Sequence, residues 1–292
     1  MEDLACEVFA DGLAAPEGPV CMGDGSVIVV EIAAGRVTRC WGDGRKETVA
    51  TPGGGPNGAA VGADGALYVC NNGGIDHEKM CHASGVGHEG RIERIDLSSG
   101  RVERVYEHCD GEALSAPNDL VIDADGSIWF SDLGKFRERS HELGGIFHAQ
   151  ADGSAIRCLH RGVTGFNGVG LSPDGGTLYV AETFTGRLLG FDTRAGKAAG
   201  PWLVGRAPGL TGFDSLAVTE AGNICVACPS DAQIASFTPD GAVTIVPLPA
   251  EMTTNIAFGG TDSRTAFVTE THGGLLLRVR WTEPGLRLAF NA

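Results

Sequence analysis

The sequence has no long hydrophobic run, few basic residues and no dense cysteine pattern, and each absence excludes a class of protein. No stretch approaches the roughly 20 apolar residues of a membrane-spanning helix, and the first residues, MEDLACEVFADG, lack the basic and then apolar run of a signal peptide. Only 22 Lys and Arg stand against 37 Asp and Glu, so the net charge of −15 argues against a surface for nucleic acid or anionic lipid. The nine cysteines are an odd number without close spacing, which favours free thiols in a reducing compartment. We therefore expect a cytoplasmic protein that binds small molecules or cations, and neither nucleic acid nor membranes.

Two further absences narrow the fold and the chemistry. No long segment repeats its apolar residues with the 3.6-residue period of a helix, which disfavours doubly wound and barrel α/β folds. The serine-nucleophile motif G-x-S-x-G is missing, which removes the commonest metal-free route to ester hydrolysis. Glycine, by contrast, is abundant: 45 glycines together with 42% hydrophobic residues indicate a folded chain with many tight turns.

One pattern recurs six times along the chain. Each copy has a polar residue, a short apolar run, a turn, and a second apolar run that usually ends in another polar residue. The copies are Glu17–Glu31, Asn57–Asn71, Asn118–Asp132, Asn167–Glu182, Asp214–Cys228 and Asn255–Glu270. The two ends of a copy are 14 residues apart in four cases and 15 in the other two. Each copy is typical of a β-hairpin whose turn contains Asp-Gly or a similar turn sequence.

Further strand-like runs lie between the copies, such as RIERIDL and RVERVY on either side of Ser99-Gly100. This gives about four strands per repeat, and repeats of about 40–50 residues with four strands are typical of β-propeller blades. We therefore predict an all-β fold: one six-bladed β-propeller domain over residues 1–292, with four antiparallel strands per blade. The N- and C-terminal strands are expected to share one blade and so close the ring.

The longest insertion, residues 71–90, has no strand period and is predicted to be a loop. It contains His77, Cys81, His82 and His88. A polar loop is the favoured interpretation, substrate contact is the next, and a second metal site is the least favoured, because adjacent Cys and His are a poor chelate.

Equivalent positions in six blades form a ring around the propeller axis, and the first residue of every copy carries a side-chain oxygen. These residues are Glu17, Asn57, Asn118, Asn167, Asp214 and Asn255. Asn and Asp also cap turns before strands, which is the alternative explanation. The presence of a side-chain oxygen at all six positions favours a shared site. Oxygen ligands without Cys or His suit a hard divalent cation. The last residues of the copies are expected to lie away from this ring, as solvated strand ends.

Several segments resemble the senescence-marker-protein/gluconolactonase (regucalcin-like) family of six-bladed propellers. They are Pro16-Glu17-Gly18-Pro19, Ala116-Pro117-Asn118-Asp119-Leu120, Phe166-Asn167-Gly168 and Gly212-Phe213-Asp214. The resemblance implies a divalent metal in the central channel, held by Glu17, Asn167 and Asp214, with Asn118 as a fourth ligand or a substrate contact. It also implies lactone hydrolysis with Asp214 or a nearby carboxylate as the base. Sugar lactonases of this family usually have Arg two residues before the Asn of the third repeat, where this chain has Ala116.

The sequence thus predicts a metal-dependent hydrolase that opens a small lactone, with Asp214 and Asn118 as its catalytic residues. The candidate metal ligands are Glu17, Asn118, Asn167 and Asp214, and the candidate substrate contacts are Asn57, Asn118, Asp119, His272 and His77. Ca²⁺ is the expected cation, with Mg²⁺, Mn²⁺ and Zn²⁺ as alternatives. A metal-dependent phosphoesterase, a lyase and a non-catalytic Ca²⁺-binding propeller remain open, as does the oligomeric state.

Overall fold

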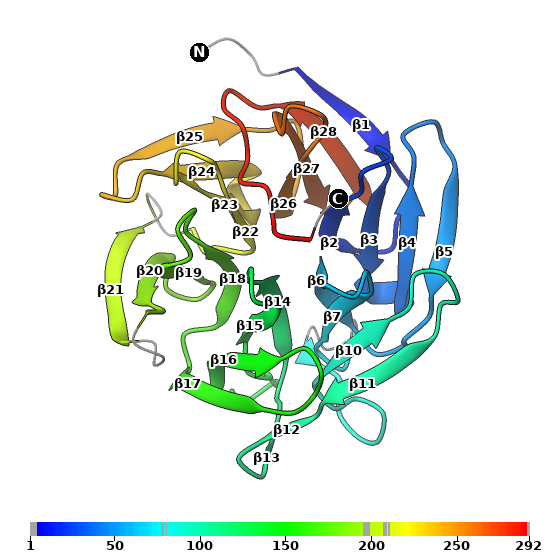
Figure 1. Ribbon diagram of the computed structural model, residues 1–292, viewed down its shortest axis with the longest axis vertical. Helices are drawn as coiled ribbons and strands as arrows, with labels where there is room; N and C mark the ends of the chain where they lie inside the picture. Colours follow the sequence, from blue (N-terminus) through cyan, green and yellow to red (C-terminus); the bar gives the residue numbers. More distant parts are fainter. Residues whose placement is uncertain are drawn as a thin grey trace.

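Six four-stranded antiparallel sheets surround a central axis, as Figure 1 shows. The computed structural model describes residues 5–76, 79, 81–194, 199–206, 209 and 211–290. The predicted six-bladed β-propeller is confirmed, including four strands per blade. No helix in these described ranges is long and apolar enough to cross a membrane.

In each blade the first strand lies next to the axis and the others follow outward (Figure 1). Blades one to three are β2–β5 (Pro16–Cys21, Val27–Glu31, Arg36–Cys40, Lys46–Ala50), β6, β7, β10 and β11 (Pro56–Val61, Leu67–Asn71, Arg91–Ile95, Val102–Tyr106), and β14–β17 (Pro117–Ile122, Ser127–Asp132, Gly144–Gln150, Ile156–Gly162). Blades four to six are β18–β21 (Phe166–Leu171, Thr177–Glu182, Arg187–Asp192, Ala199–Arg206), β22–β25 (Leu216–Val218, Ile224–Cys228, Gln233–Phe237, Val243–Pro247), and β26–β28 with β1 (Thr253–Gly259, Thr265–Glu270, Leu275–Arg280, Cys6–Ala10). Outside the blades lie the pairs β8–β9 (Ile75–Asp76, Cys81–His82) and β12–β13 (His108–Cys109, Glu112–Ala113), and the 3₁₀ turns η1 (Ile32–Ala34) and η2 (Pro229–Asp231).

The N-terminal strand closes the ring, as predicted. Strand β1 pairs antiparallel with β28, with Val8 opposite Leu277, so the two ends of the chain build one blade. This closure leaves no gap between the first blade and the last, because the outermost strand of blade six comes from the start of the chain.

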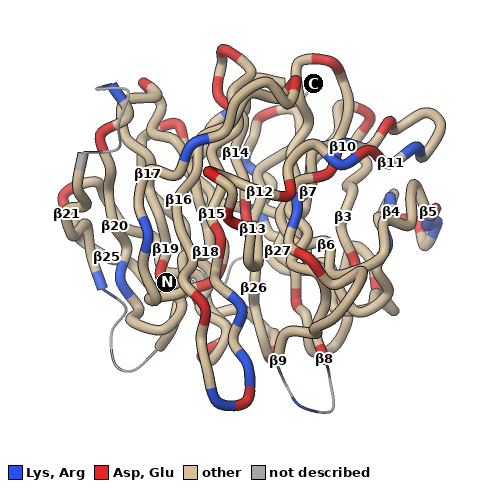
Figure 2. Tube along the Cα trace, turned by 90° about the horizontal axis from the view of Figure 1, so that it is seen from below, with Lys and Arg blue, Asp and Glu red and all other residues tan. Residues whose placement is uncertain are grey.

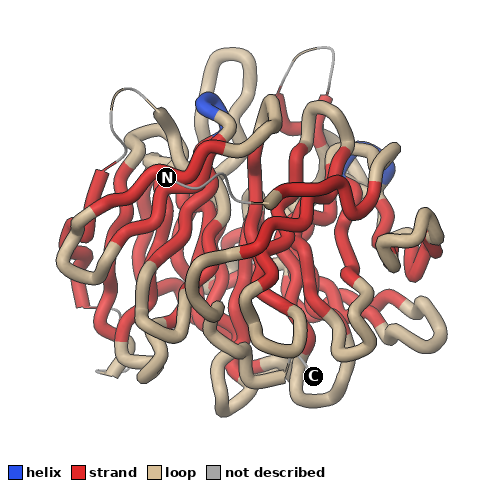
Figure 3. Tube along the Cα trace, turned by 90° about the horizontal axis from the view of Figure 1, so that it is seen from above, coloured by secondary structure: helices blue, strands red, loops and turns tan. Residues whose placement is uncertain are grey.

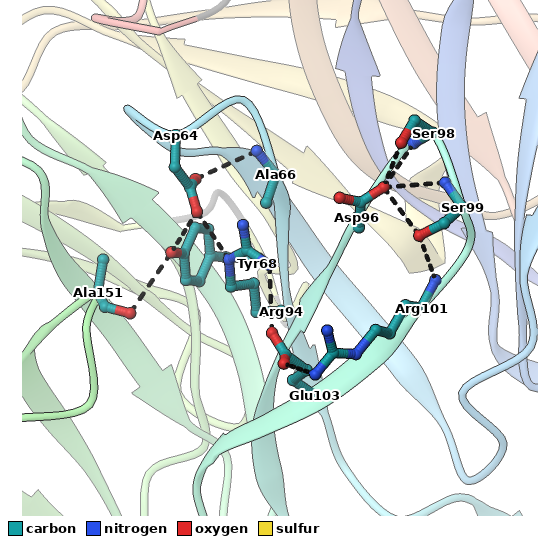
Figure 4. A network of polar contacts seen from close by, with 10 residues as sticks. All are labelled: Asp64, Ala66, Tyr68, Arg94, Asp96, Ser98, Ser99, Arg101, Glu103 and Ala151. Atoms are coloured by element: carbon teal, nitrogen blue, oxygen red, sulfur yellow. Dashed lines mark hydrogen bonds and ion pairs between the residues drawn. The ribbon is translucent and has the colours of Figure 1, made fainter.

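The hairpin turns are made by aspartates that bind the backbone two residues on. In blade one the Asp24 carboxylate accepts the N–H of Ser26 at 3.0 Å, and Gly25 adopts φ +84°, a conformation that other residues rarely take. In blade two Asp64 accepts the N–H of Ala66 in the same way and also an N–H of Arg94 (Figure 4). Aspartates accept such backbone N–H groups in five of the inner hairpins, and in blade five the Thr219 hydroxyl accepts the N–H of Asn223 instead.

The hydrophobic core consists of six clusters, and each cluster joins two neighbouring blades. Between blades two and three, for example, the rings of Phe130 and Phe147 stack at 4.9 Å in a cluster that also contains Tyr68. The Tyr68 hydroxyl donates across the same junction to the carbonyl of Ala151 (Figure 4). Since both faces of every blade are covered, the inner strands are held in fixed positions around the axis.

The two faces of the propeller differ. Figure 2 places the β8–β9 pair on one face and the C-terminus on the opposite face. The first face is also where the inner strands begin and where η1 and η2 lie (Figure 3). We call it the entry face.

Candidate functional site

The predicted ring of oxygen-bearing side chains lies at the entry face, where the inner strands begin. Glu17, Asn57, Asn118, Asn167 and Asn255 are within the first three residues of their inner strands, and each is at most 7% exposed. Asp214 is partly exposed and stands two residues before β22. The inner strands contact one another in sequence around the axis, so these side chains belong to one ring.

Direct contacts connect four of these residues into two pairs. The Asn255 amide donates to a Glu17 carboxylate oxygen at 2.7 Å, and the backbone N–H of Gly18 donates to the same oxygen at 2.8 Å. On the other side of the ring the Asn167 side chain is hydrogen-bonded to Asp214, whose pKa this bond lowers in part. The negative charge of Glu17 acts on Asp214 in turn and raises its pKa, so the pairs lie close enough to interact.

Register irregularities aim the ring residues into the channel. In five inner strands the regular pairing with the second strand breaks next to the ring residue, for example between Glu17 and Val20 and between Pro117 and Leu120. Such bulges turn side chains that regular pleating would place on alternate faces. Gly18 has φ +49°, and a Cβ there would lie 2.3 Å from the carbonyl oxygen of Asn57. The close approach of β2 to β6 beside the ring therefore requires glycine.

Three carboxylates share the inside of the ring: Glu17 and Asp119 are buried, and Asp214 is partly exposed. Burial raises the pKa of Glu17, raises that of Asp214 well above its ordinary value, and raises that of Asp119 to about 7; the charge of Glu17 adds to both aspartate shifts. Among the described residues, no lysine or arginine contributes to these shifts. The ring is thus an uncompensated negative site, which a cation would neutralise.

One further observation fits a cation. The Asn118 side-chain oxygen is buried and has no hydrogen-bond partner, which is costly unless a ligand contacts it. Two carboxylates and two amides offer oxygen to a cation at this level, from Glu17, Asp214, Asn118 and Asn167. In the part of the chain that the structure describes, no three His, Cys, Asp or Glu side chains are grouped to hold a metal, so the amides are essential to this set. The donor set suits a hard divalent cation with water in its remaining positions.

Several residues outside the predicted set position the ring. The Asn167 amide donates to the Thr183 hydroxyl at 2.9 Å, the Ser215 hydroxyl lies 3.4 Å from the Asn167 side-chain oxygen, and the Ser131 hydroxyl donates to the Asn167 carbonyl. Thr183, Ser215 and Ser131 each adjoin an end of a repeat. Their place beside the repeat ends is the one sequence signal that could have identified them.

The last residues of the repeats are not where they were expected. Pro16 pairs with Glu31 and Pro117 with Asp132, so the second polar ends lie beside the ring and not away from it. The expectation was wrong because an antiparallel hairpin returns its second strand to the end where the first began. Nor are these ends solvated: Glu31, Asn71, Asp132, Glu182 and Glu270 are at most 2% exposed.

These buried ends anchor the segments that lead into the inner strands. The Asp132 carboxylate accepts the backbone N–H groups of Ser115, Ala116 and Gly134 at 2.7–2.9 Å. Glu31 accepts the N–H of Ala14 in the same way. The repeats therefore carry two layers of polar residues, one that lines the channel and one that holds the first in position.

Replacing Asp132 with alanine is expected to destabilise the protein by about 3–5 kcal/mol, because it leaves three backbone N–H groups without acceptors in a buried segment. Urea denaturation followed by circular dichroism measures this change. Asp152→Ala is the matched control, since Asp152 caps an exposed turn of the same blade through Ser154. Equal effects of the two substitutions would contradict the anchoring role.

The remaining predicted residues have different surroundings. Asp119 follows Asn118 and accepts the N–H of Leu120 at 2.9 Å, one level deeper in the channel than the ring. His272 lies on the loop after β27, with a side chain 68% exposed and its Nε2 3.3 Å from Glu251. His77 lies outside the described residues. The structure therefore brings Asp119 to the ring and leaves His272 at the surface of the entry face.

The insertion at residues 71–90 is not purely a loop. It contains the pair β8–β9, and it packs on the segment after β15: the His82 ring meets Phe136 edge-on at 4.4 Å, and Arg137 donates to the His82 and Ala83 carbonyls. Burial and the nearby cations Lys135 and Arg137 lower the pKa of His82 to about 4. Described residues of the insertion thus have structural contacts with blade three, which a search for strand periods over 71–90 missed because each strand has only two residues.

A cavity of about 590 Å³ occupies the channel on the far side of the ring. Asp119 and Asn255 line its inner end, and apolar side chains such as Leu120, Leu216 and Ile256 form its walls. The chain after β28 crosses its outer end: the N–H of Leu286 donates to the Val218 carbonyl at 2.9 Å. The run LRLAF at residues 286–290 therefore covers the channel and adds no strand to a blade.

Comparison with known proteins identifies the family. The model of the "SMP-30/Gluconolactonase/LRE-like region" matches residues 15–272. A gluconolactonase of Zymomonas mobilis is 23% identical over 94% of this chain and 81% of its own length. A solved gluconolactonase structure from Xanthomonas campestris superposes with a TM-score of 0.78 at 24% identity, covering 96% of this chain and 90% of the other. A solved regucalcin from Agrobacterium tumefaciens, described as a calcium-binding protein, superposes with a TM-score of 0.77 at 21% identity and covers 98% of both chains.

Proposed function

The chain belongs to the SMP-30/gluconolactonase/LRE-like family, and from that premise we propose that it is a hydrolase that opens small lactones to hydroxy acids with the help of a divalent cation. The relatives named gluconolactonase support the reaction, and the calcium-binding relative supports the cation. The observation that carries the proposal is the buried ring itself: carboxylates with raised pKa values and an unpartnered amide oxygen converge without any basic residue among their partners.

The residues that would hold the cation are Glu17, Asn118, Asn167 and Asp214. Their two negative charges balance a 2+ ion, and their oxygen chemistry suits Ca²⁺ first and Mg²⁺ or Mn²⁺ next, while Zn²⁺ prefers nitrogen or sulfur. A divalent cation in such a site supplies polarisation of an ester carbonyl and a lower pKa for water. Contacts with Thr183 and Ser215 hold the Asn167 side chain in position for this role.

The protein groups perform the proton transfer and the orientation. Asp214 is the proposed base, because it is the one partly exposed carboxylate of the ring and can meet a water that approaches from the entry face. The water oxygen bonds to the lactone carbonyl carbon while Asp214 takes its proton. The ring C–O bond then breaks, and the alkoxide oxygen receives that proton, which leaves a hydroxy acid. Asn118 and Asn57 are the proposed contacts that orient the lactone.

The test is acid release, followed with a pH indicator, from sugar and non-sugar lactones by metal-stripped protein. We expect no turnover above background without metal and restoration by Ca²⁺, Mg²⁺ or Mn²⁺. Zn²⁺ serves as a fourth arm, and p-nitrophenyl phosphate tests the phosphoesterase alternative. Turnover that is unchanged by metal removal would overturn the proposed role of the cation. No turnover of any lactone with any of these ions would overturn the proposed hydrolase activity.

A further inference from the structure

The entry face has an apolar sector on blades three and four. Among the described residues, Leu143, Val163 and Phe184 are each more than half exposed, and all three lie on loops at the entry-face ends of these blades. We call these residues, with Leu133 and His141, the apolar wall. Scattered exposed apolar side chains are ordinary, but Phe184 contacts His141 and lies beside Leu133, and the residue before Phe184 contacts the ring.

The wall is built around Phe184. Its ring meets the His141 ring edge-on at 5.0 Å. A Cβ on Gly165 would lie 2.7 Å from the Phe184 ring and 3.4 Å from a methyl of Leu133, so glycine at position 165 lets the two side chains close over the backbone. The backbone N–H of Phe184 donates to the Thr164 carbonyl at 3.2 Å, which fixes the loop that carries the ring.

The wall is continuous with the proposed catalytic ring on two sides. Thr183, the residue before Phe184, accepts the hydrogen bond of the Asn167 amide. Leu133 donates its backbone N–H to the carbonyl of Ala116, two residues before Asn118. The Ala116 side chain is a fully buried methyl group.

Charged residues lie on the same loop as Leu133, His141 and Leu143. The Lys135 ammonium donates to the His88 carbonyl, and Arg137 pairs with Glu142 at 2.9 Å. These charged groups have partners within the protein, whereas the side chains of Leu143, Val163 and Phe184 are more than half exposed and can meet a hydrocarbon group.

We propose that the apolar wall binds a hydrocarbon substituent of the lactone, so that the preferred substrates carry an alkyl or aryl chain in place of ring hydroxyls, and that Phe184 determines this specificity. This inference rests on the proposed function. Since the wall contacts a part of the substrate that does not react, it contributes binding that is equal in the ground state and the transition state. Its loss therefore raises KM and leaves kcat unchanged.

The experiment compares three δ-lactones with one ring size: δ-valerolactone without a chain, δ-decanolactone with a pentyl chain, and glucono-δ-lactone with hydroxyls. For the native protein we expect kcat/KM for δ-decanolactone to exceed that of the other two by about tenfold, the effect of partly burying a short alkyl chain. Phe184→Ala should raise KM for δ-decanolactone about tenfold and leave δ-valerolactone unchanged, and Phe184→Leu should recover part of the loss. Trp202→Ala, an exposed aromatic residue on β21, is the control and should change neither.

The outcomes separate this inference from the proposed function. Equal kcat/KM values for δ-valerolactone and δ-decanolactone, or equal effects of Phe184→Ala on the two lactones, would overturn the role of Phe184. Neither result would contradict the proposed hydrolase activity. If no lactone is hydrolysed, binding of 2-pentylcyclohexanone and cyclohexanone, measured by ligand-observed NMR, replaces turnover, since these ketones present a ring carbonyl that water cannot open. Tighter binding of the pentyl ketone that Phe184→Ala removes would support the wall, and equal binding of the two ketones would overturn it.

Discussion

Replacing Asp214 with asparagine is expected to lower kcat/KM for lactone opening by a factor of about 100 to 10,000, the usual contribution of a general base. The substitution keeps a side-chain oxygen that can contact a cation and removes the group that takes the proton from water. Because Asp214 is held by Asn167 on one side and acted on by Glu17 on the other, the amide of the same shape should leave the ring intact. The measurement is steady-state acid release at saturating metal, with Asp152→Asn in an exposed turn as the control for a lost carboxylate.

The same variant should be at least as stable as the native protein when both are metal-free. It removes the carboxylate whose pKa is raised by desolvation and by the charges of Glu17 and Asp119. Loss of turnover combined with unchanged or increased stability distinguishes a catalytic role from a folding defect. Activity within threefold of the native protein would exclude Asp214 as the base and direct attention to Glu17 or Asp119.

The propeller could be predicted because its information is local to each repeat. A turn sequence between two apolar runs specifies a hairpin within about 15 residues. Six such hairpins, four of them with an Asp-Gly turn, leave few alternatives to a closed ring. The ring formed by the first residues of the six repeats followed from the same alignment, since equivalent positions of a repeat are equivalent in space. The resemblance to a known family then singled out four of them, Glu17, Asn118, Asn167 and Asp214, as candidate metal ligands. These inferences required no knowledge of contacts between distant residues.

The features that could not be predicted depend on contacts between residues that are far apart in the sequence. Asp132 looks like a strand end, and only its three backbone donors show that it anchors the segment before Asn118. The run at residues 286–290 is rich in apolar residues and short enough for a strand, but the outer strand of blade six is already supplied by β1, so the run covers the channel instead. The apolar wall likewise joins Leu133 and Phe184 from two blades, which no local pattern connects.

Metal-free protein is expected to lose stability as the pH rises from about 4 to about 7, and a divalent cation should restore it. In the unfolded chain Asp119 ionises near pH 4, whereas in the fold its pKa is raised to about 7. Below pH 4 the carboxyl is protonated in both states and costs nothing. Between the two pKa values only the unfolded state gains by ionising, so the free energy of unfolding falls with rising pH. Three pKa units correspond to about 4 kcal/mol for Asp119, and the raised pKa values of Glu17 and Asp214 act in the same direction.

A cation reverses this trend because it binds the ionised ring of the folded state and so lowers these pKa values. Urea denaturation at pH 5, 6, 7 and 8, in a chelator and in Ca²⁺, should therefore give two curves that diverge as the pH rises. Asp119→Asn should flatten the chelator curve without abolishing the effect of Ca²⁺, because Asp119 is one level below the proposed ligands. Glu17→Gln should diminish the effect of Ca²⁺ itself. A chelator curve that stays flat or rises between pH 5 and pH 8 would show that the buried carboxylates are compensated within the protein, and the main reason to place a cation among them would be lost.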